Sequence, residues 1–162
     1  MKISTKGRYA LRMMIDLAEH APEGYVALKD VAARQEISLK YLEQIVTPLS
    51  RAGLVASAKG PQGGYRLARP AASYSVHEVL QSIEGNLAPV SCLELPENDC
   101  PRRDQCKSLP FWQELWSLMV SYMDAVTLAD LVWAPNAVKE KAACIQKVLD
   151  NAEKQEYHIK NI

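Results

Sequence analysis

Residues 28–55, LKDVAARQEISLKYLEQIVTPLSRAGLV, decide the fold. The stretch contains two helical patterns of apolar residues, at 28–34 and at 38–53, and only three residues separate them. Apolar side chains of the first pattern can face those of the second across this short connection. Two amphipathic helices joined in this way predict a helix-turn-helix.

Favourable residues mark both ends of the second helix. Ser38 can accept a hydrogen bond from the first turn as an N-cap, and Gly53 is a good C-terminal stop. Pro48 lies inside the same pattern. Because proline lacks a backbone N–H and its ring crowds the preceding turn, we expect a bend or break there.

The sequence on either side predicts a winged helix. An earlier helical pattern covers residues 8–20, and residues 54–68, LVASAKGPQGGYRLA, alternate in hydropathy around a glycine-rich tip, as in a β-hairpin. A further helix is expected at 75–85, with a Ser-x-x-Glu capping box at its start. We therefore predict a mainly α fold in which residues 1–85 form a winged helix-turn-helix domain with a small β-hairpin wing.

Three further segments follow this domain. Residues 86–109 contain three cysteines and little periodicity, which predicts a long loop that a functional group must order. Residues 110–133 predict a long dimerisation helix and a following short helix. Residues 134–162 predict a helical tail.

The long helix carries a wide apolar stripe with two tryptophans. Such a stripe needs a partner, and pairing with the same helix of a second copy is the economical arrangement. This pairing would place two recognition helices about one DNA turn apart, or a multiple of that distance. The predicted dimer contacts are Trp112, Leu115, Trp116, Met119, Tyr122, Met123 and Val126.

Composition and charge narrow the function. The 162 residues are 48% hydrophobic, which suits a packed core. Residues 1–69 carry 11 Lys and Arg against 6 Asp and Glu (net +5), and residues 70–162 carry 8 against 13 (net −5). A basic first half favours a nucleic-acid partner. Apolar runs are too short or too interrupted for a membrane span or a secretory signal, so we expect a cytoplasmic protein without a membrane partner.

The candidate DNA contacts fall on three segments. Side chains at the start of a recognition helix can reach base edges, and cations can bind phosphate. Glycine at a wing tip allows close approach to a minor groove. The structural alternative is a solvated helix face and an ordinary glycine turn. The candidates are Ser38, Lys40, Tyr41, Glu43 and Gln44 on the helix, Lys59, Gly60 and Gln62 on the wing, and Lys2, Lys6 and Arg8 at the N-terminus.

The cysteines indicate metal or redox chemistry. Cys92, Cys100 and Cys106 lie within 15 residues, whereas Cys144 stands apart. In a chain without an export signal, clustered thiols favour such chemistry over structural disulfides. Thiolates bind iron in iron–sulfur clusters, and nearby basic residues would help to hold an anionic cluster. Zinc, reversible thiol oxidation and cysteines without a function are the alternatives.

An enzyme is not expected. The three histidines form no catalytic constellation, and the sequence contains no nucleophile motif, phosphate loop or paired carboxylates. The competing class is a DNA-independent module that binds a metal or a protein partner. Steep weakening of duplex binding with salt would argue against that class.

Over nearly the first 133 residues the chain resembles the IscR/CymR-type (Rrf-two) winged-helix transcription regulators. The resemblance rests on MKISTKGRYAL, SLKYLEQIVTPLSRAGLV, GPQGGYRLA, VLQSIEG and the cysteine-rich loop that leads into LPFWQELWSLM and TLADLV. It implies a winged-helix domain with a long dimerisation helix, a homodimer, and a roughly palindromic operator in double-stranded DNA as the partner.

Many members of this family hold an iron–sulfur cluster on three cysteines of this loop. The resemblance therefore implies Cys92, Cys100 and Cys106 as ligands, with a 2Fe–2S cluster favoured over a 4Fe–4S cluster. Members of the IscR type typically place a histidine three residues after the third cysteine, where this chain has Leu109. The fourth ligand stays open among Cys144, Glu43, His77, Asp104 and an N-terminal residue of the second subunit.

The branches of the family differ in the signal they sense. The first 70 residues look closest to the cysteine-metabolism repressor CymR, which lacks these cysteines, while the loop looks like that of IscR or the nitric-oxide-sensing NsrR. The expected signal is iron–sulfur status, redox state, nitric oxide or cysteine supply. The alternative is the same repressor with a zinc or thiol-oxidation switch.

Overall fold

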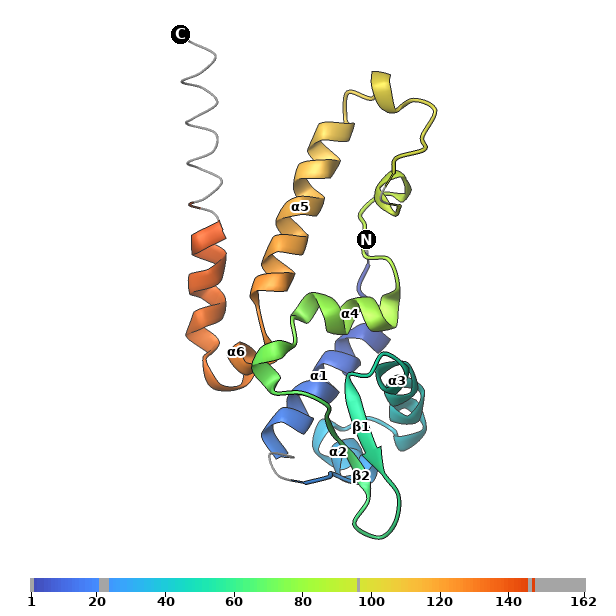
Figure 1. Cartoon of the computed structure of the whole chain (residues 1–162), viewed down its shortest axis with the longest axis vertical. Coiled ribbons are helices and arrows are strands. Elements are labelled where there is room, and N and C mark those ends of the chain that lie inside the picture. The colour runs from blue at the N-terminus through green and yellow to red at the C-terminus, as the bar shows by residue number, and fades with distance from the viewer. Residues whose placement is uncertain (1, 21–23, 96, 146, 148–162) are drawn as a thin grey trace.

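The computed structural model describes residues 2–20, 24–95, 97–145 and 147. A winged-helix domain forms one end of the molecule, and a long helix, α5, extends away from it (Figure 1). The predicted fold class is confirmed. The domain consists of α1 (Thr5–His20), α2 (Leu28–Gln35), α3 (Leu39–Arg51), β1 (Val55–Ala58), β2 (Gly64–Leu67) and α4 (Val76–Glu84).

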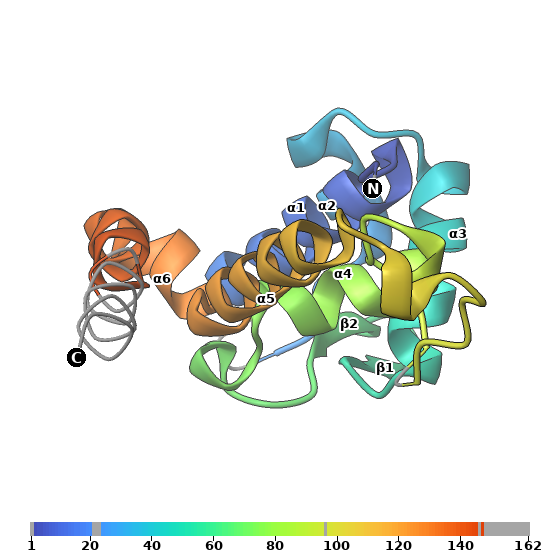
Figure 2. The ribbon, with the colours of Figure 1, turned by 90° about the horizontal axis from the view of Figure 1, so that it is seen from above.

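Residues 86–108, which we call the cysteine loop, connect α4 to α5. The loop contains two short 3-10 turns, Ser91–Leu93 and Arg103–Gln105, and another, Ala71–Ser73, precedes α4. The loop leads into α5 (Leu109–Ala125), which is followed by α6 (Leu128–Trp133) and by a helix over residues 135–145. Figures 1 and 2 agree that the cysteine loop and this last helix lie on opposite sides of α5. Within the described part of the chain, no helix is both long and apolar enough to cross a bilayer.

One hydrophobic core joins the helix-turn-helix to α1. Leu42, Ile45 and Leu49 of α3 are fully buried in it. Tyr74 is also fully buried, and its hydroxyl donates to the carbonyl oxygen of Leu54 at 2.8 Å. A buried hydroxyl needs such a partner, so the bond fixes the chain between β2 and α4 against the start of β1.

α3 runs through Pro48 as one continuous helix, so of the expected bend or break the break is wrong. The predicted N-cap is confirmed, since the side chain of Ser38 accepts a hydrogen bond from the N–H of Tyr41 at 3.3 Å. Proline near the C-terminal end removes only one helical hydrogen bond. Its buried neighbours Val46 and Leu49 keep the last turns of the helix packed in the core.

β1 and β2 form the predicted hairpin, in an antiparallel register that pairs Val55 with Leu67. β2 also bonds to the segment before α2. The N–H of Val26 donates to the carbonyl of Tyr65 at 2.9 Å, and the reverse bond is 2.8 Å. This approach requires Gly64, because a Cβ there would lie 2.2 Å from the carbonyl oxygen of Val26.

The capping box predicted for α4 is only half formed. The side chain of Ser75 accepts a hydrogen bond from the N–H of Glu78 at 3.1 Å. The carboxylate of Glu78 instead accepts a bond from Nη2 of Arg69 at 2.7 Å. A guanidinium attracts a carboxylate more strongly than a neutral backbone N–H does.

A buried carboxylate ties α1 to the end of α2. Asp16 is fully buried and accepts hydrogen bonds from Nε and Nη2 of Arg34, at 3.0 and 2.6 Å, and from Nε2 of Gln35 at 2.9 Å. Burial by itself raises the pKa of Asp16, but these bonds and the charge of Arg34 hold that pKa below its ordinary value. Arg12 also donates to the backbone carbonyl of Gln35, at 2.6 Å. The last turn of α2, just before the turn into α3, is therefore anchored to α1.

Replacing Arg34 with methionine should destabilise the domain, because it leaves the Asp16 carboxylate buried without its charged partner. We expect the free energy of unfolding at neutral pH to fall by about 2 to 3 kcal/mol, less than for a wholly buried pair because the Arg34 side chain is 33% exposed. The pair contributes fully above the pKa of Asp16 in the unfolded chain, and its contribution disappears as the pH falls through the lower folded-state pKa. The loss should therefore shrink in acid.

Urea denaturation at neutral and acidic pH measures this effect, with Arg51→Met as the matched surface control. Arg51 is exposed at the end of α3 and no hydrogen bond or ion pair ties it to Asp16. Equal stability of the two variants at neutral pH would contradict the role of the pair.

Candidate nucleic-acid interface and cysteine loop

The exposed face of α3 presents polar side chains where a recognition helix would carry them. Lys40, Glu43 and Gln44 are exposed, and they lie away from the face that α3 buries in the core. Lysine can donate to guanine, glutamate can accept from cytosine, and glutamine can pair with adenine in the major groove. The hydroxyl of Ser38 caps the helix at the same end. The start of α3 is therefore rigid and suited to reading base edges.

Tyr41, another of the predicted DNA contacts, packs partly against α1. Its half-buried ring packs edge-on against the ring of Tyr9, with the centroids 5.8 Å apart and an angle of 87° between the planes. The guanidinium of Arg12 lies 5.3 Å from the Tyr9 ring centroid. Tyr41 therefore joins the recognition helix to α1, and its aromatic body belongs to the edge of the core.

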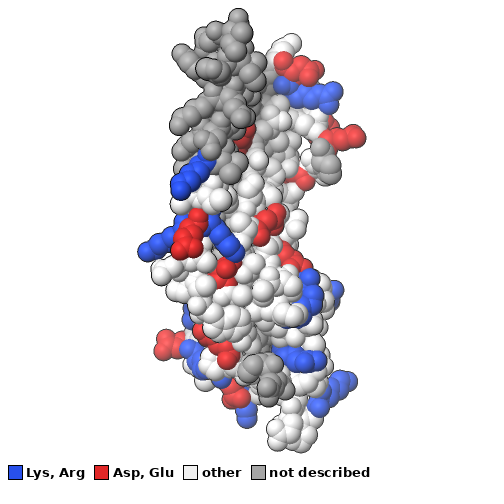
Figure 3. All heavy atoms as spheres, turned by 60° about the vertical axis from the view of Figure 1, so that its left-hand side comes forward, with Lys and Arg blue, Asp and Glu red and all other residues white. Residues whose placement is uncertain are grey.

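The wing presents an exposed tip. Lys59, Gly60 and Gln62 are exposed at the outer end of the hairpin (Figure 1). Gly60 has a φ of 106°, a backbone conformation that other residues rarely adopt. Figure 3 shows more lysine and arginine side chains in its lower half, over the winged-helix domain, than in its upper half. On the two elements themselves, Lys40 of α3 and Lys59 at the wing tip are exposed cations.

α4 holds the start of α1, which carries the N-terminal cations. The N–H and the hydroxyl of Ser4 donate to one carboxylate oxygen of Glu84, at 3.0 and 2.7 Å. A Cβ on Gly7 would lie 2.1 Å from this oxygen, so the contact depends on glycine there. The cations near this contact are Lys2 and Arg8, which are exposed, and Lys6, which is partly exposed.

The cysteine loop carries three free, partly exposed thiols. Cys92 lies in the first 3-10 turn, the N–H of Cys100 donates to Oδ1 of Asn98 at 3.0 Å, and Cys106 follows the second turn. Cys144 is exposed on the helix of residues 135–145, on the other side of α5. Across the described residues, no three His, Cys, Asp or Glu side chains come together as metal ligands. The loop therefore supplies thiol donors without holding them in a preformed site.

Hydrogen bonding lowers the pKa of Cys106. Its sulfur lies 3.5 Å from the hydroxyl of Ser108, which is the main cause. The backbone N–H groups of Ser108 and Leu109 and the positive charge of Arg102 also lower this pKa, whereas burial acts in the opposite direction. Because the thiolate is the form that binds metals and reacts with oxidants, Cys106 is prepared for either chemistry.

α5 carries one apolar stripe that faces its own winged-helix domain. Trp116 and Met119 pack against a small cluster formed by Leu80, Leu87 and Met123. Met123 is 9% exposed and Val126, which follows the helix, is 3% exposed. This placement differs from the expectation that Trp116, Met119, Met123 and Val126 contact a second copy, since the chain itself covers these side chains wholly or in part.

A second stripe on α5 is left open. Phe111 is 62% exposed and Tyr122 36%, and Leu115 and Leu118 between them are partly exposed. Trp112 lies beside this stripe, with its ring edge-on to Phe111 at 4.9 Å. Phe111 and Leu118 are absent from the predicted contacts. The sequence does contain a signal for this stripe. Apolar residues at positions 111, 115, 118 and 122 are spaced by 4, 3 and 4 residues, which places them on one face of a helix. Positions 112, 116, 119 and 123 have the same spacing and lie on the neighbouring face.

A polar contact also joins α4 to α5. Nδ1 of His77 lies 2.9 Å from Oδ1 of Asp124, and the hydroxyl of Ser75 lies 3.3 Å from the same oxygen. The ring of Trp116 packs edge-on to His77 with the centroids 6.2 Å apart. Local sequence gives no sign of this contact of His77, because its partner lies 47 residues further along the chain.

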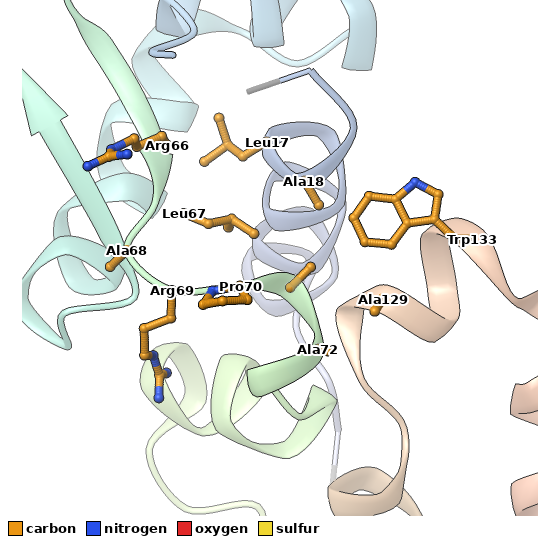
Figure 4. A pocket seen from close by; sticks show the side chains of 11 residues that line it. Leu17, Ala18, Arg66, Leu67, Ala68, Arg69, Pro70, Ala72, Ala129 and Trp133 are labelled. Atoms are coloured by element: carbon orange, nitrogen blue, oxygen red, sulfur yellow. The ribbon is translucent and has the colours of Figure 1, made fainter. Parts of the chain in front are cut away.

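A cavity of about 580 Å³ lies between α1, the segment after β2, and α6 (Figure 4). The indole of Trp133 forms one wall and faces Ala18 and Ala129. The guanidinium of Arg69 at the other side is already bonded to Glu78. None of the described residues of α3 or of the cysteine loop lines this cavity, so it is separate from both candidate sites.

An exposed polar face on the recognition helix, a wing with a cationic tip and a basic N-terminal helix together define a DNA-binding winged-helix transcription regulator. Residues 3–134 match the family model of Rrf2, described as an iron-dependent transcriptional regulator, and the chain belongs to this family. The resemblance found in the sequence is confirmed. The expectation of a regulator rather than an enzyme is confirmed as well, because the relatives are named as regulators.

Three relatives illustrate this membership. Protein rrf2 of Nitratidesulfovibrio vulgaris is 42% identical over 133 residues, covering 82% of this chain and 87% of that protein. The transcriptional regulator IscR of Aliivibrio salmonicida is 39% identical over 132 residues, covering 82% of this chain and 77% of that protein. The solved structure of CymR, the global cysteine regulator of B. subtilis, has a TM-score of 0.66 and 37% identity, covering 82% of this chain and 96% of that one.

Cys106 should react with iodoacetamide more slowly when Ser108 is replaced by alanine, because the hydroxyl that stabilises the thiolate is lost. We expect a rate decrease of several-fold near neutral pH in the reduced, metal-free protein. The difference should vanish at alkaline pH, where Cys106 is a thiolate in both proteins. Peptide mass spectrometry measures the rate at each cysteine, and Ser91→Ala, next to Cys92, serves as the control. Equal rates for Cys106 in both proteins would contradict this role of Ser108.

Proposed function

We propose that this chain acts as a homodimer, binds a roughly palindromic operator in double-stranded DNA, and senses its signal through an iron–sulfur cluster on the cysteine loop. The observation that carries the DNA-binding proposal is the exposed polar face of α3, with its capped N-terminus and fully buried rear face. A helix held in this way can enter the major groove without bending or unwinding.

Cations on three elements support the docking of this face. Lys40 lies at the start of α3, Lys59 at the tip of the wing, and Lys2, Lys6 and Arg8 around the start of α1. Lysine and arginine near phosphates supply most of the sequence-independent affinity for DNA. Glu43 and Gln44 would then supply sequence selection, because their side chains can pair with base edges.

The open stripe on α5 supports the homodimer. A row of exposed aromatic and aliphatic side chains on a helix is unfavourable in water, and burying it against the same row of a second copy removes it from solvent. A two-fold axis would bring the same surface from both copies together. The spacing of the two α3 helices would then depend on the angle between α5 and its own domain.

The donor set of the cysteine loop fits an iron–sulfur cluster in its chemistry. Cys92, Cys100 and Cys106 would be the ligands, and a bound cluster would supply iron that responds to redox state or to small gases. The family description as iron-dependent also supports this proposal. Ser108 and Arg102 favour the thiolate at Cys106, and Asn98 orders the turn before Cys100. Because the described residues hold no preformed group of metal ligands, cluster binding and rearrangement of the loop would occur together.

The contacts of α5 offer a route from the loop to the DNA-binding surface. The loop ends at the first turn of α5, where the N–H of Leu109 donates to the carbonyl of Cys106 at 3.2 Å. α5 packs on α4 through Trp116 and Met119, which lie against the cluster of Leu80, Leu87 and Met123. The contact between His77 and Asp124 also joins the two helices. A change in the loop would therefore bias the angle of α5, and with it the spacing of the recognition helices.

The free thiols of the cysteine loop favour a second candidate, the same regulator with a thiol-oxidation switch. All three loop cysteines are free and partly exposed, and the pKa of Cys106 is lowered, so oxidation requires no metal. A zinc ion on the same thiolates is the third form of this proposal. These forms share the DNA-binding surface and differ in what the loop holds.

Loss of the cation at the wing and loss of the amide on α3 should have different effects on DNA binding. Lys59→Gln should weaken binding to all duplexes and reduce the slope of log affinity against log salt by about one. Gln44→Ala should weaken binding to the preferred sequence by about 1 to 3 kcal/mol and leave non-specific binding almost unchanged.

Fluorescence anisotropy over a series of salt concentrations measures both effects, on a duplex selected from a random library and on a scrambled duplex. Lys139→Gln, on the exposed side of the helix of residues 135–145, is the charge-matched control. The absence of any preference between the two duplexes in the wild type would overturn the proposed function.

Anaerobically purified protein should show thiolate-to-iron absorption with iron and sulfide in equal amounts, and Cys100→Ala should lose both. Cys144→Ala is the control and should keep them, because Cys144 lies on the other side of α5. Duplex affinity should differ between the loaded and the cluster-free protein at fixed salt. A protein that stays colourless after reconstitution would overturn the proposal of an iron–sulfur cluster. Its zinc content would then distinguish a zinc site from a thiol-oxidation switch. Equal affinity of the two forms would overturn regulation through that duplex.

A further inference from the structure

One large apolar side chain lies at the edge of the polar face of α3. Leu39 is the first residue of the helix and is 43% exposed. Among the described residues of α2, the turn and α3, Leu39 is the only large hydrophobic residue whose side chain is exposed. Exposed leucines are common on protein surfaces and have no meaning by themselves. The position of this one gives it meaning, because the first turn of a recognition helix is the part that reaches base edges.

The surroundings of Leu39 separate it from the core. Leu42 and Val46, its neighbours on the core side of the helix, are 0% and 4% exposed. Glu43 stands one turn further along the helix on the outer side, and Lys40 is adjacent in sequence. The N-cap bond from the N–H of Tyr41 to Ser38 fixes the first turn, so the Leu39 side chain leaves the backbone in a defined direction. An apolar side chain on a fixed first turn therefore lies beside polar side chains that can address base edges.

The major groove has one apolar group, the C5-methyl of thymine. Lysine, glutamate and glutamine can pair with guanine, cytosine and adenine, but none of them recognises this methyl group. An aliphatic side chain recognises it by excluding water from both surfaces. We propose that Leu39 is a specificity-determining residue that contacts a thymine methyl group in each half-site of the operator.

This inference rests on the proposed function, because it requires α3 to lie in the major groove. It adds a base preference that the polar side chains of α3 do not supply. The contact is small and apolar, so it should change sequence selection more than the dependence of affinity on salt.

The test compares thymine with deoxyuridine, which lacks only the methyl group. A duplex selected from a random library by the wild-type protein is synthesised with each thymine in turn replaced by deoxyuridine. Affinities are measured for the wild type, for Leu39→Ala and for Leu39→Met, which keeps an aliphatic side chain. Leu95→Ala, at a 61% exposed leucine in the cysteine loop, is the matched control.

In the wild type, we expect one position in each half-site at which loss of the methyl weakens binding about fourfold, the ratio that corresponds to burial of one methyl-sized group. Leu39→Ala should abolish this effect at that position, while Leu39→Met and Leu95→Ala should retain it. The inference is overturned if no thymine is sensitive, or if Leu39→Ala and the wild type lose the same factor. Circular dichroism checks that each variant is folded. If Leu39→Ala does not fold, Leu39→Gln, which keeps the length of the side chain but makes it polar, should abolish the effect in its place, and retention of the effect in that variant would overturn the inference.

A failure of the Leu39 proposal can be distinguished from a failure of the proposed DNA-binding function. If the wild type prefers its selected duplex and Gln44→Ala weakens that preference, α3 reads DNA, and an absent methyl effect removes only the role of Leu39. If neither Gln44→Ala nor Lys59→Gln changes binding, the docking of α3 and the wing itself is wrong, and this inference falls with it.

Discussion

The buried carboxylate of Asp16 is the interaction on which the orientation of the recognition helix depends. A charge inside an apolar core is tolerated only where partners compensate for its lost hydration, and here the partners come from Arg34 and Gln35 at the end of α2. α1 and the last turn of α2 are therefore locked together. Glu36 then ends α2 in a left-handed conformation with a φ of 54°, and Ile37 is buried. The anchored end of α2 and this turn together set the direction in which α3 begins.

From that point the amphipathic character of α3 determines which side chains meet solvent. Its apolar face is taken up by the core, so the polar face with Lys40, Glu43 and Gln44 must point outward. The N-cap at Ser38 stabilises the first turn, and the contact of Tyr41 with Tyr9 restrains the helix laterally. The candidate DNA-reading surface is thus a consequence of packing behind it. Its rigidity suits recognition, because little order has to be gained on binding.

α5 connects the cysteine loop to the winged-helix domain, and its two apolar faces have different surroundings. One face packs on α4 through Trp116 and Met119, and the neighbouring face leaves Phe111 and Tyr122 open to solvent. The cysteine loop ends where α5 begins, so any force on the loop acts on a helix that contacts its own domain along part of its length. A sensor and a DNA reader can be coupled through such a helix without direct contact between them.

The sequence by itself determined the elements whose signals are local. The helix-turn-helix, the hairpin, the cap at Ser38 and the polar surface of α3 follow from spacing and from the chemistry of single residues, because helix periodicity and capping depend on residues a few positions apart. Tertiary structure alone decided the continuity of α3 through Pro48, the pairing of Glu78 with Arg69, and the packing of the Tyr41 ring against α1. It also divided the wide stripe of α5 into a face for its own domain and an open face. Each of these outcomes depends on which distant side chain lies nearby, and the physical reason is that burial and pairing are set by neighbours in space and not by neighbours along the chain.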